Sequence, residues 1–220
     1  YCYQHRGERG IKALIIYPMN ALATDQAKRI AELIYGSDEL RGNVTVGMYV
    51  GGQEHTPART MSEHGVITDH ETMLNNAPDI LMTNYKMLDY LLVRPKDALL
   101  WQDNEPETLK YIAVDELHTF DGAQGTDLAC LLRRLKRRLG IYDGYLCCVG
   151  TSATMGSKEN NSNILNYAEE IFGEPFDKDA IITEDRLSAQ EFFAGAEVTE
   201  FTLPTVEQVI ELEKLSEEDE

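Results

Sequence analysis

Short apolar runs alternate with amphipathic stretches along the first two thirds of the chain. The apolar runs are too short for buried helices, so they predict five strands. These cover residues 13–17, 44–50, 79–84, 111–116, and a run from 145 that continues into a loop ending at 154. Between them, apolar side chains recur every three or four residues and predict helices over about 21–35, 86–93 and 126–139. This alternation predicts an α/β fold, with a parallel sheet covered by helices on both faces.

Polar clusters follow all five predicted strands. They occupy residues 18–20, 51–52, 83–84, 115–118 and 151–154. In a parallel sheet the carboxyl ends of the strands meet at one edge, and ligands bind beyond that edge. The sequence therefore predicts one functional edge that is built from five loops.

The last third of the chain differs from the rest in charge and in periodicity. Residues 158–220 carry 4 Lys and Arg against 18 Asp and Glu, whereas residues 1–157 carry 16 against 20. Most of the net charge of −18 therefore lies in an acidic extension, for which the pattern predicts helices over 164–173, 184–193 and 206–215. We expect a domain over 1–157 and an acidic helical extension over 158–220 that leads toward a further domain. The near-neutral first part leaves room for a surface that binds nucleic acid.

Composition argues against several other classes of protein. The longest apolar stretches, 13–17 and 145–150, are far shorter than the ~20 residues that span a bilayer, so no membrane association is expected. The four cysteines form neither a disulfide framework nor a CxxC zinc pattern, which indicates a reducing, cytoplasmic setting. The first residue is Tyr1 and no signal-peptide core follows it, so we expect a piece of a longer protein.

Asp115 and Glu116 raise the question of chemistry because they follow directly on the apolar run 111–114. Two carboxylates at the end of a buried strand are costly unless a cation or hydrogen bonds compensate their charge. Metal-assisted hydrolysis is one interpretation, and a capped loop is the other. A metal hydrolase with histidine ligands is disfavoured, because the histidines show no HxH or HExxH spacing.

Five segments together resemble one family. They are YPMNALATDQ (17–26), the Gly51-Gly52 pair, TNYKML (83–88), VDELH (114–118) and GTSAT (150–154). In this order and spacing they resemble motif Ia, the GG doublet, motif Ib, motif II and motif III in the first RecA-like domain of superfamily 2 DExH/DEAD-box helicases. The stretch HTFDGAQGTDLACLLRRLKRRL (118–139) is similar to that of large bacterial helicases related to MrfA/YprA and Lhr, a group that neighbours phage-defence helicases. The resemblance implies a RecA-like sheet and an ATP-dependent helicase or translocase acting in DNA repair or phage defence.

The resemblance also implies roles for the polar residues of motifs II and III. Asp115 would hold Mg²⁺ through water beside ATP, and Glu116 would orient and deprotonate the attacking water. His118 would relay the nucleotide state toward motif III. The hydroxyl residues Thr151, Ser152 and Thr154 would link the ATP state to domain closure, a role that is compatible with ordinary turn and capping chemistry.

Motif Ia, the glycine pair and motif Ib imply contacts with the backbone of a nucleic-acid strand. We expect DNA, with RNA as the alternative. The residues concerned are Pro18, Asn20, Gly51, Gly52, Thr83 and Asn84. Asn20 is also predicted to cap the helix that starts near Ala21, whose N-terminus would favour a phosphate. The basic run 133–138 is instead typical of the solvated face and C-terminal end of an amphipathic helix.

Two parts of a complete helicase motor are missing from the sequence. It contains no GxxxxGK(S/T) phosphate loop and none of the arginine motifs of a second RecA-like domain. We expect the phosphate loop, with one strand and most of a helix, to lie upstream of Tyr1, and the second domain to be a partner within the same parent chain. The piece alone is then expected to be inactive. The alternative is a non-catalytic RecA-like scaffold with an acidic docking tail, and a GK(S/T) sequence upstream would decide for the motor.

Overall fold

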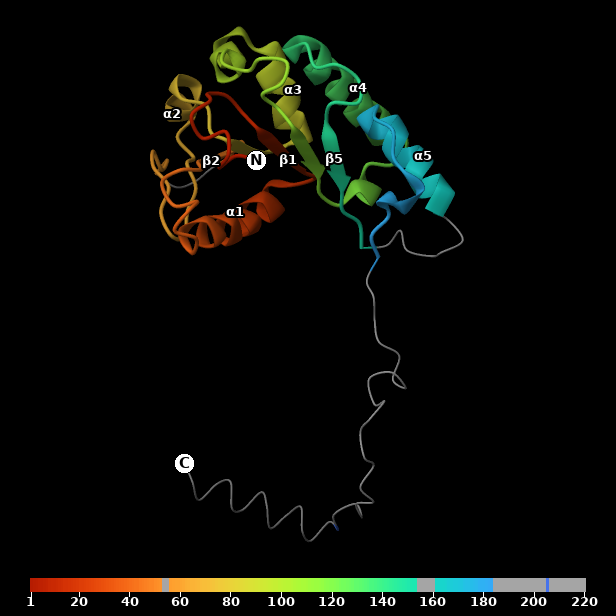
Figure 1. The fold of residues 1–220 in the computed structure, drawn as a ribbon, viewed down its shortest axis with the longest axis horizontal. Helices are drawn as coiled ribbons and strands as arrows, with labels where there is room; N and C mark the ends of the chain where they lie inside the picture. Colours follow the sequence, from red (N-terminus) through yellow and green to blue (C-terminus); the bar gives the residue numbers. More distant parts are fainter. Residues whose placement is uncertain (53–55, 154–160, 184–204, 206–220) are drawn as a thin grey trace. The chain divides into compact units, whose positions relative to one another are not determined.

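One parallel sheet organises the fold, which the computed structural model describes for residues 1–52, 56–153, 161–183 and 205 (Figure 1). Its strands are β1 (Ala13–Tyr17), β2 (Val46–Tyr49), β3 (Ile80–Asn84), β4 (Tyr111–Val114) and β5 (Cys147–Gly150). They lie in the order β2-β3-β1-β4-β5, and every neighbouring pair is parallel. The predicted α/β architecture with a parallel sheet is confirmed.

Helices cover both faces of the sheet, as the sequence predicts (Figure 1). They are α1 (Asn20–Tyr35), α2 (His70–Asn75), α3 (Tyr85–Val93), α4 (Gly122–Leu139) and α5 (Asn161–Phe172), with 3-10 turns η1 (Pro95–Trp101), η2 (Leu117–Thr119) and η4 (Lys178–Ala180). The alanine stripe of α1 shares one core with Met48 and Met82, whereas α3, α4 and α5 share a larger core with Leu14 and Leu81. Successive strand residues such as Leu81 and Met82 point to opposite faces, which separates the two cores.

Several element boundaries lie close to those predicted. β1 covers the predicted residues 13–17, and α1 begins one residue before the predicted Ala21. β2 is shorter than the predicted run 44–50. Just before its start, the backbone N and the hydroxyl of Thr45 both donate to Asp79 Oδ2, at 2.7 and 2.8 Å, while Thr45 O still accepts from Ile80 N of β3 at 3.0 Å.

The basic run at the end of α4 is largely the solvated face that the sequence predicts, because Arg133, Arg134, Arg137 and Arg138 are exposed, but Lys136 departs from it. The side chain of Lys136 is only 8% exposed, and its Nζ lies 2.6 Å from Glu174 Oε1. Arg133 and Arg138 donate to backbone carbonyls of α5 and α3, and Arg134 forms an ion pair with a carboxylate of α3. These cations therefore tie α4 to its neighbouring helices.

The two edge strands of the sheet differ in how they are covered. All four residues of β2 are buried. In β5, by contrast, Cys147, Val149 and Gly150 are exposed, Val149 at 47%. An uncovered edge strand presents unpaired N–H and C=O groups to another strand. Of the two edges, β5 is therefore the one at which the sheet can be extended.

The chain divides into two compact units, Tyr1–Ile182 and Thr183–Glu220, and the functional edge belongs to the first. Within that unit α5 packs against α4. The predicted domain boundary between 157 and 158 stays a prediction, and the predicted helices over 184–193 and 206–215 lie outside the described residues. Across the described ranges, no helix combines the length and apolar character that a bilayer span requires.

Candidate functional site

The parallel register places the strand ends at one edge of the sheet. Tyr17 of β1 pairs with Asn84 of β3, and Ile16 pairs with Val114 of β4, which pairs in turn with Gly150 of β5. β2 joins the edge through its last residue, which pairs with the residue before Asn84. The loops that carry the predicted site residues therefore start side by side.

The acidic turn after β4 combines a residue that is still bonded to β1 with a strained one. Asp115 N donates to Ile16 O at 2.9 Å, which continues the pairing with β1 for one more residue. Glu116 then adopts the left-handed conformation, with φ 51° and ψ 48°, and among the described residues it is the one non-glycine residue with a positive φ. That conformation costs on the order of 1 kcal/mol for a residue with a Cβ, so the surrounding bonds must hold it.

Thr151, the first residue after β5, supplies those bonds. Its hydroxyl donates to Asp115 Oδ1 at 2.5 Å and accepts from Glu116 N at 3.1 Å. Its carbonyl accepts from Leu117 N at 2.8 Å. One residue thus bonds to Asp115, Glu116 and Leu117, and the loops after β4 and β5 form one unit.

His118 links the acidic turn to the same loop. Its Nδ1 lies 3.1 Å from Ser152 Oγ and 3.3 Å from Glu116 Oε2. An ionised carboxylate only accepts hydrogen bonds, so the tautomer with the proton on Nδ1 suits this position. The side chains of Glu116 and His118 are 35% and 28% exposed, which lets both reach a ligand at the edge. Thr154, the third predicted hydroxyl residue, lies outside the described residues.

Tyr17 lies at the end of β1 beside the acidic turn. Burial, and after it the negative charge of Asp115, raise the pKa of the Tyr17 phenol to about 12, so it is neutral at physiological pH. The charge of Asp115 is itself offset by the Thr151 hydroxyl and by partial exposure. Within the described ranges, no group of three or more His, Cys, Asp or Glu side chains is placed to hold a metal ion.

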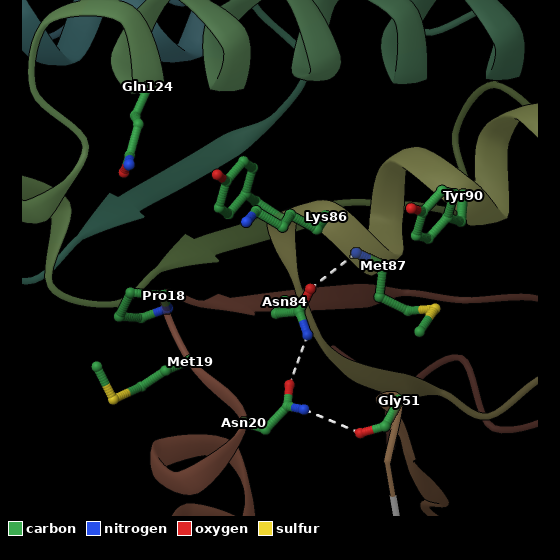
Figure 2. A pocket seen from close by; sticks show the side chains of 10 residues that line it. Pro18, Met19, Asn20, Gly51, Asn84, Lys86, Met87, Tyr90 and Gln124 are labelled. Atoms are coloured by element: carbon green, nitrogen blue, oxygen red, sulfur yellow. Dashed lines mark hydrogen bonds between the residues drawn. The ribbon is translucent and has the colours of Figure 1, made fainter.

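An open pocket of about 350 Å³ is the second feature of this edge (Figure 2). The segment from β1 into α1, the loop after β2 and the junction of β3 with α3 line it, together with the rest of α3 and the first turn of α4. Four of the six residues predicted to contact nucleic acid, Pro18, Asn20, Gly51 and Asn84, lie in its walls. Three segments that are far apart in sequence therefore share one concave surface.

Side-chain hydrogen bonds join the three segments of this pocket that follow β1, β2 and β3 (Figure 2). Asn84 Nδ2 donates to Asn20 Oδ1 at 2.5 Å, and Asn20 Nδ2 donates to Gly51 O at 2.9 Å. Asn84 Oδ1 accepts from Met87 N at 2.7 Å and so caps α3. The prediction that Asn20 caps α1 is wrong. The N-cap is Met19, which makes no side-chain capping bond. The side-chain amide of Asn20 bonds instead to Gly51 O and Asn84 Nδ2.

Thr83 and Gly52 are not among the lining residues. Thr83 is fully buried, and its hydroxyl donates to Tyr49 O at 2.7 Å, so it supports the end of β2 from within. Gly52 has a φ of 75°, a conformation that favours glycine. At Gly51 an added Cβ would lie 3.3 Å from Met87 Cε, so glycine permits the close approach of this loop to α3.

The pocket also contains residues that the sequence analysis does not assign. They include Lys86 and Tyr90 of α3 and Gln124 of α4. Lys86 lies within TNYKML, the segment that resembles motif Ib. Its position in that motif, at the start of a helix, was the sequence signal that could have identified it as a pocket residue. Gln124 precedes the predicted start of its helix at residue 126, and Tyr90 is masked by the apolar residues around it in the sequence.

The comparison with sequence families and known proteins agrees with the motifs. Residues 2–162 match the family model "DEAD/DEAH box helicase". YprA of Bacillus subtilis (strain 168), an uncharacterized ATP-dependent helicase, is 31% identical over 166 residues, which cover 74% of this chain and 19% of YprA. The Druantia protein DruE of Escherichia coli (strain UMEA 4076-1) is 36% identical over 115 residues, which cover 49% of this chain and 6% of DruE. The chain thus spans less than a fifth of these relatives' length.

The fold is similar to that of the DUF1998 helicase MrfA, solved with DNA and AMPPNP. The TM-score is 0.52 at 29% sequence identity, and the match covers 75% of this chain and 20% of MrfA. The predicted RecA-like helicase fold and the predicted similarity to MrfA/YprA helicases are therefore confirmed. The chain belongs to the DEAD/DEAH box helicase family.

Proposed function

We propose that this chain is the part of an ATP-dependent DNA helicase or translocase that carries the hydrolytic carboxylates and part of the DNA-binding surface. The observation that carries the proposal is the turn at Asp115 and Glu116, which Thr151 holds at the same sheet edge as the pocket. Family membership and the similarity to helicases support it.

The acidic turn fits a magnesium ion that arrives with ATP. Mg²⁺ keeps several of its waters and commonly binds through one or two carboxylates and the substrate phosphates, so no cage of protein ligands is needed. Asp115 offers a partly exposed carboxylate that Thr151 already orients. We assign Asp115 to hold the ion through water. When bound, the ion would neutralise phosphate charge.

Glu116 is assigned to the attacking water. Its partly exposed carboxylate leaves a turn whose backbone is fixed by Thr151. It would orient the water and accept its proton as the water attacks the terminal phosphate of ATP. The Nδ1 of His118, 3.3 Å from the carboxylate, would keep Glu116 in that orientation.

His118, Thr151 and Ser152 are assigned to transmit the nucleotide state. The 3.1 Å contact between His118 and Ser152 joins the turn that would meet ATP to the loop after β5. A change in the position of Glu116 would move this loop through the histidine and through the Thr151 hydroxyl. Thr154 is assigned the same role from the family resemblance. The second RecA-like domain of the same parent chain is the proposed receiver.

The pocket is proposed to bind the backbone of DNA. Within the described part of the chain none of its lining residues is acidic, and Lys86 adds a cation. The first turns of α1, α3 and α4 reach the pocket, and helix N-termini favour phosphates. Direct contacts are assigned to Pro18, Asn20, Gly51, Gly52 and Asn84, with Thr83 as their buried support. The DNA-bound MrfA structure supports DNA over RNA.

We expect Asn84→Asp to weaken binding of single-stranded DNA by about tenfold or more, because it places a negative charge beside the phosphates. The aspartate keeps the acceptor that caps α3 but loses the donor to Asn20, so thermal stability should change little. Fluorescence anisotropy of labelled DNA with the full-length protein, at one fixed salt concentration, measures the effect. Asn76→Asp makes the same charge change before β3, at the opposite end of the sheet, and should leave DNA binding unchanged. Equal affinities of the two variants would remove Asn84 from the DNA surface.

We expect the 220-residue chain by itself to show no Mg-dependent ATPase activity. Its sequence contains no GxxxxGK(S/T), whose backbone N–H groups would surround the phosphates. The open edge of β5 is where we propose that a further strand, with this loop, completes the sheet. Phosphate release with MgATP and single-stranded DNA measures the activity. Robust turnover would mean that the phosphate site forms within this chain.

The function as a whole is tested on the full-length protein, by DNA-stimulated ATP hydrolysis and by strand separation. We place this activity in the cytoplasm, in DNA repair or phage defence, and an RNA arm of the same assays tests the alternative substrate. A full-length protein that hydrolyses no ATP in the presence of either nucleic acid would favour the non-catalytic scaffold with its acidic docking tail.

A further inference from the structure

The pocket has an aromatic and thioether lining that contacts with phosphates alone do not require. Tyr90 and Met87 of α3 contribute to it, and so does Met19 from the loop after β1 (Figure 2). Met19 is 57% exposed and Tyr90 is 50% exposed. Exposed apolar side chains that gather in one pocket mark a binding surface rather than ordinary scattered surface residues.

Arg94 holds the ring of Tyr90. Its guanidinium carbon lies 4.1 Å from the centroid of the tyrosine ring, and its backbone N donates to Tyr90 O at 2.9 Å. A guanidinium stacks on one face of an aromatic ring. Tyr90 is half exposed beside this stack and lines the pocket, so part of its surface remains accessible to a ligand.

A buried carboxylate orders Arg94 in turn. Asp97 is 1% exposed, and its Oδ2 lies 3.9 Å from Arg94 Nη1 without a hydrogen-bond partner among the described residues. Its Oδ1 accepts from the Tyr49 hydroxyl at 3.2 Å. A buried charge is strongly destabilising without a counter-charge, so Asp97 requires Arg94 close by. The stack of Arg94 on Tyr90 is therefore formed before any ligand arrives.

Charge and shape together select the class of ligand. Among the residues that the structure describes, the lining includes one cation, Lys86, and no carboxylate. A ligand that carries a flat aromatic group and a negative charge matches both the Tyr90 ring and Lys86. A nucleotide unit of a DNA strand has both parts.

We propose that Tyr90 is a stacking platform for one nucleobase of single-stranded DNA whose backbone follows the carboxyl ends of β1, β2 and β3. The inference rests on the proposed DNA-binding function of the pocket and adds a base contact to its backbone contacts. The bases of a duplex are already stacked on their neighbours, so the platform favours single strands. Every base has a flat face, so the platform accepts all four.

The test compares DNA that has bases with DNA that lacks them. Binding of full-length wild-type protein, Tyr90→Ala and Tyr90→Phe is measured at fixed salt with a thymidine oligonucleotide and with an abasic oligonucleotide of equal length. We expect Tyr90→Ala to weaken thymidine binding about 5- to 150-fold, the usual effect of removing one base–aromatic stack. Abasic DNA should bind wild-type protein and Tyr90→Ala equally. Tyr90→Phe should keep most of the affinity for the thymidine oligonucleotide, because it keeps the ring. Tyr142→Ala, which removes a similarly exposed tyrosine (53%) from the turn before β5, is the matched control.

The outcomes separate the inference from the function on which it rests. If Tyr90→Ala weakens the binding of both oligonucleotides equally, or of neither, the proposal of a stacking platform is wrong, and the proposed backbone contacts are unaffected. The platform is also wrong if Tyr90→Phe loses as much affinity as Tyr90→Ala. If the full-length wild-type protein binds neither oligonucleotide, the proposed DNA-binding function falls, and the platform with it.

Discussion

Glu116→Gln is expected to slow ATP turnover by the full-length protein about 100- to 10,000-fold, the usual contribution of general acid–base catalysis. Glutamine has the shape of glutamate but cannot take a proton from water. The left-handed backbone at this position costs glutamine about as much as glutamate, so the turn and its bonds to Thr151 should persist. We therefore expect ATP binding, measured by calorimetry, to be retained while phosphate release is lost.

Glu39→Gln is the matched control, because it neutralises an exposed carboxylate in the loop after α1. Its phosphate release should equal that of the wild-type protein. If Glu116→Gln also hydrolysed ATP at the wild-type rate, Glu116 would lose its assigned role as general base. The acidic turn would then be a capped loop, the other interpretation that its sequence allows.

Lys136→Met is expected to lower the free energy of unfolding by about 3–5 kcal/mol, because it leaves a buried carboxylate without its partner. Lys136 Nζ lies 2.6 Å from Glu174 Oε1, and the Glu174 side chain is only 3% exposed. Urea denaturation of the 220-residue chain, followed by the fluorescence of Trp101, its single tryptophan, measures the change. The control Lys28→Met removes an exposed lysine 3.9 Å from its carboxylate partner and should cost less than about 1 kcal/mol.

The effect of Lys136 also has a pH dependence whose direction follows from its pKa. Burial lowers the pKa of Lys136, but hydrogen bonds and charges from Glu174 and Asp143 outweigh it and raise the pKa above the ordinary value. Because the pKa of Lys136 is higher in the folded than in the unfolded chain, its ion pair contributes its full stabilisation below the unfolded-state pKa of about 10.4. This stabilisation is lost as the pH rises through the folded-state pKa. The difference in free energy of unfolding between wild type and Lys136→Met should therefore become smaller above about pH 10.4.

A double variant separates the ion pair from simple loss of packing. Lys136→Met combined with Glu174→Leu removes both charges, so it should recover much of the stability that the single variant loses. A loss below about 1 kcal/mol in the single variant, equal to that of the surface control, would mean that the pair does not hold α4 to the segment after α5.

The sequence predicted this fold well where one pattern dominated locally. The apolar run 13–17 has no competing interpretation, and it became β1 residue for residue. The predicted start of α4 at residue 126 was late by one helical turn, because Gly122 and Gly125 are poor helix formers. Gly125 is required by packing: an added Cβ would lie 2.5 Å from Phe120 O. This contact is with the turn that leads into the same helix, and it leaves no periodic signal in the sequence.

The site was predictable as a set of residues but not as a set of connections. Motif spacing brought Asn20, Gly51 and Asn84 to one edge, but only the folded structure gives the bonds between their side chains. It also places Thr83 inside the core. α2 was missed because it is short and buries a single residue, Met73. Its boundary depends on a side-chain cap rather than on a hydrophobic stripe.

Position 116 sets the requirements of folding and of chemistry against each other. Its left-handed backbone is one that glycine adopts freely, so a chain selected for stability alone would carry glycine there. The carboxylate is instead kept at a conformational cost that Thr151 and the neighbouring loop offset. The turn is consequently a trade-off, in which the proposed catalytic group has the one positive φ found among the described non-glycine residues.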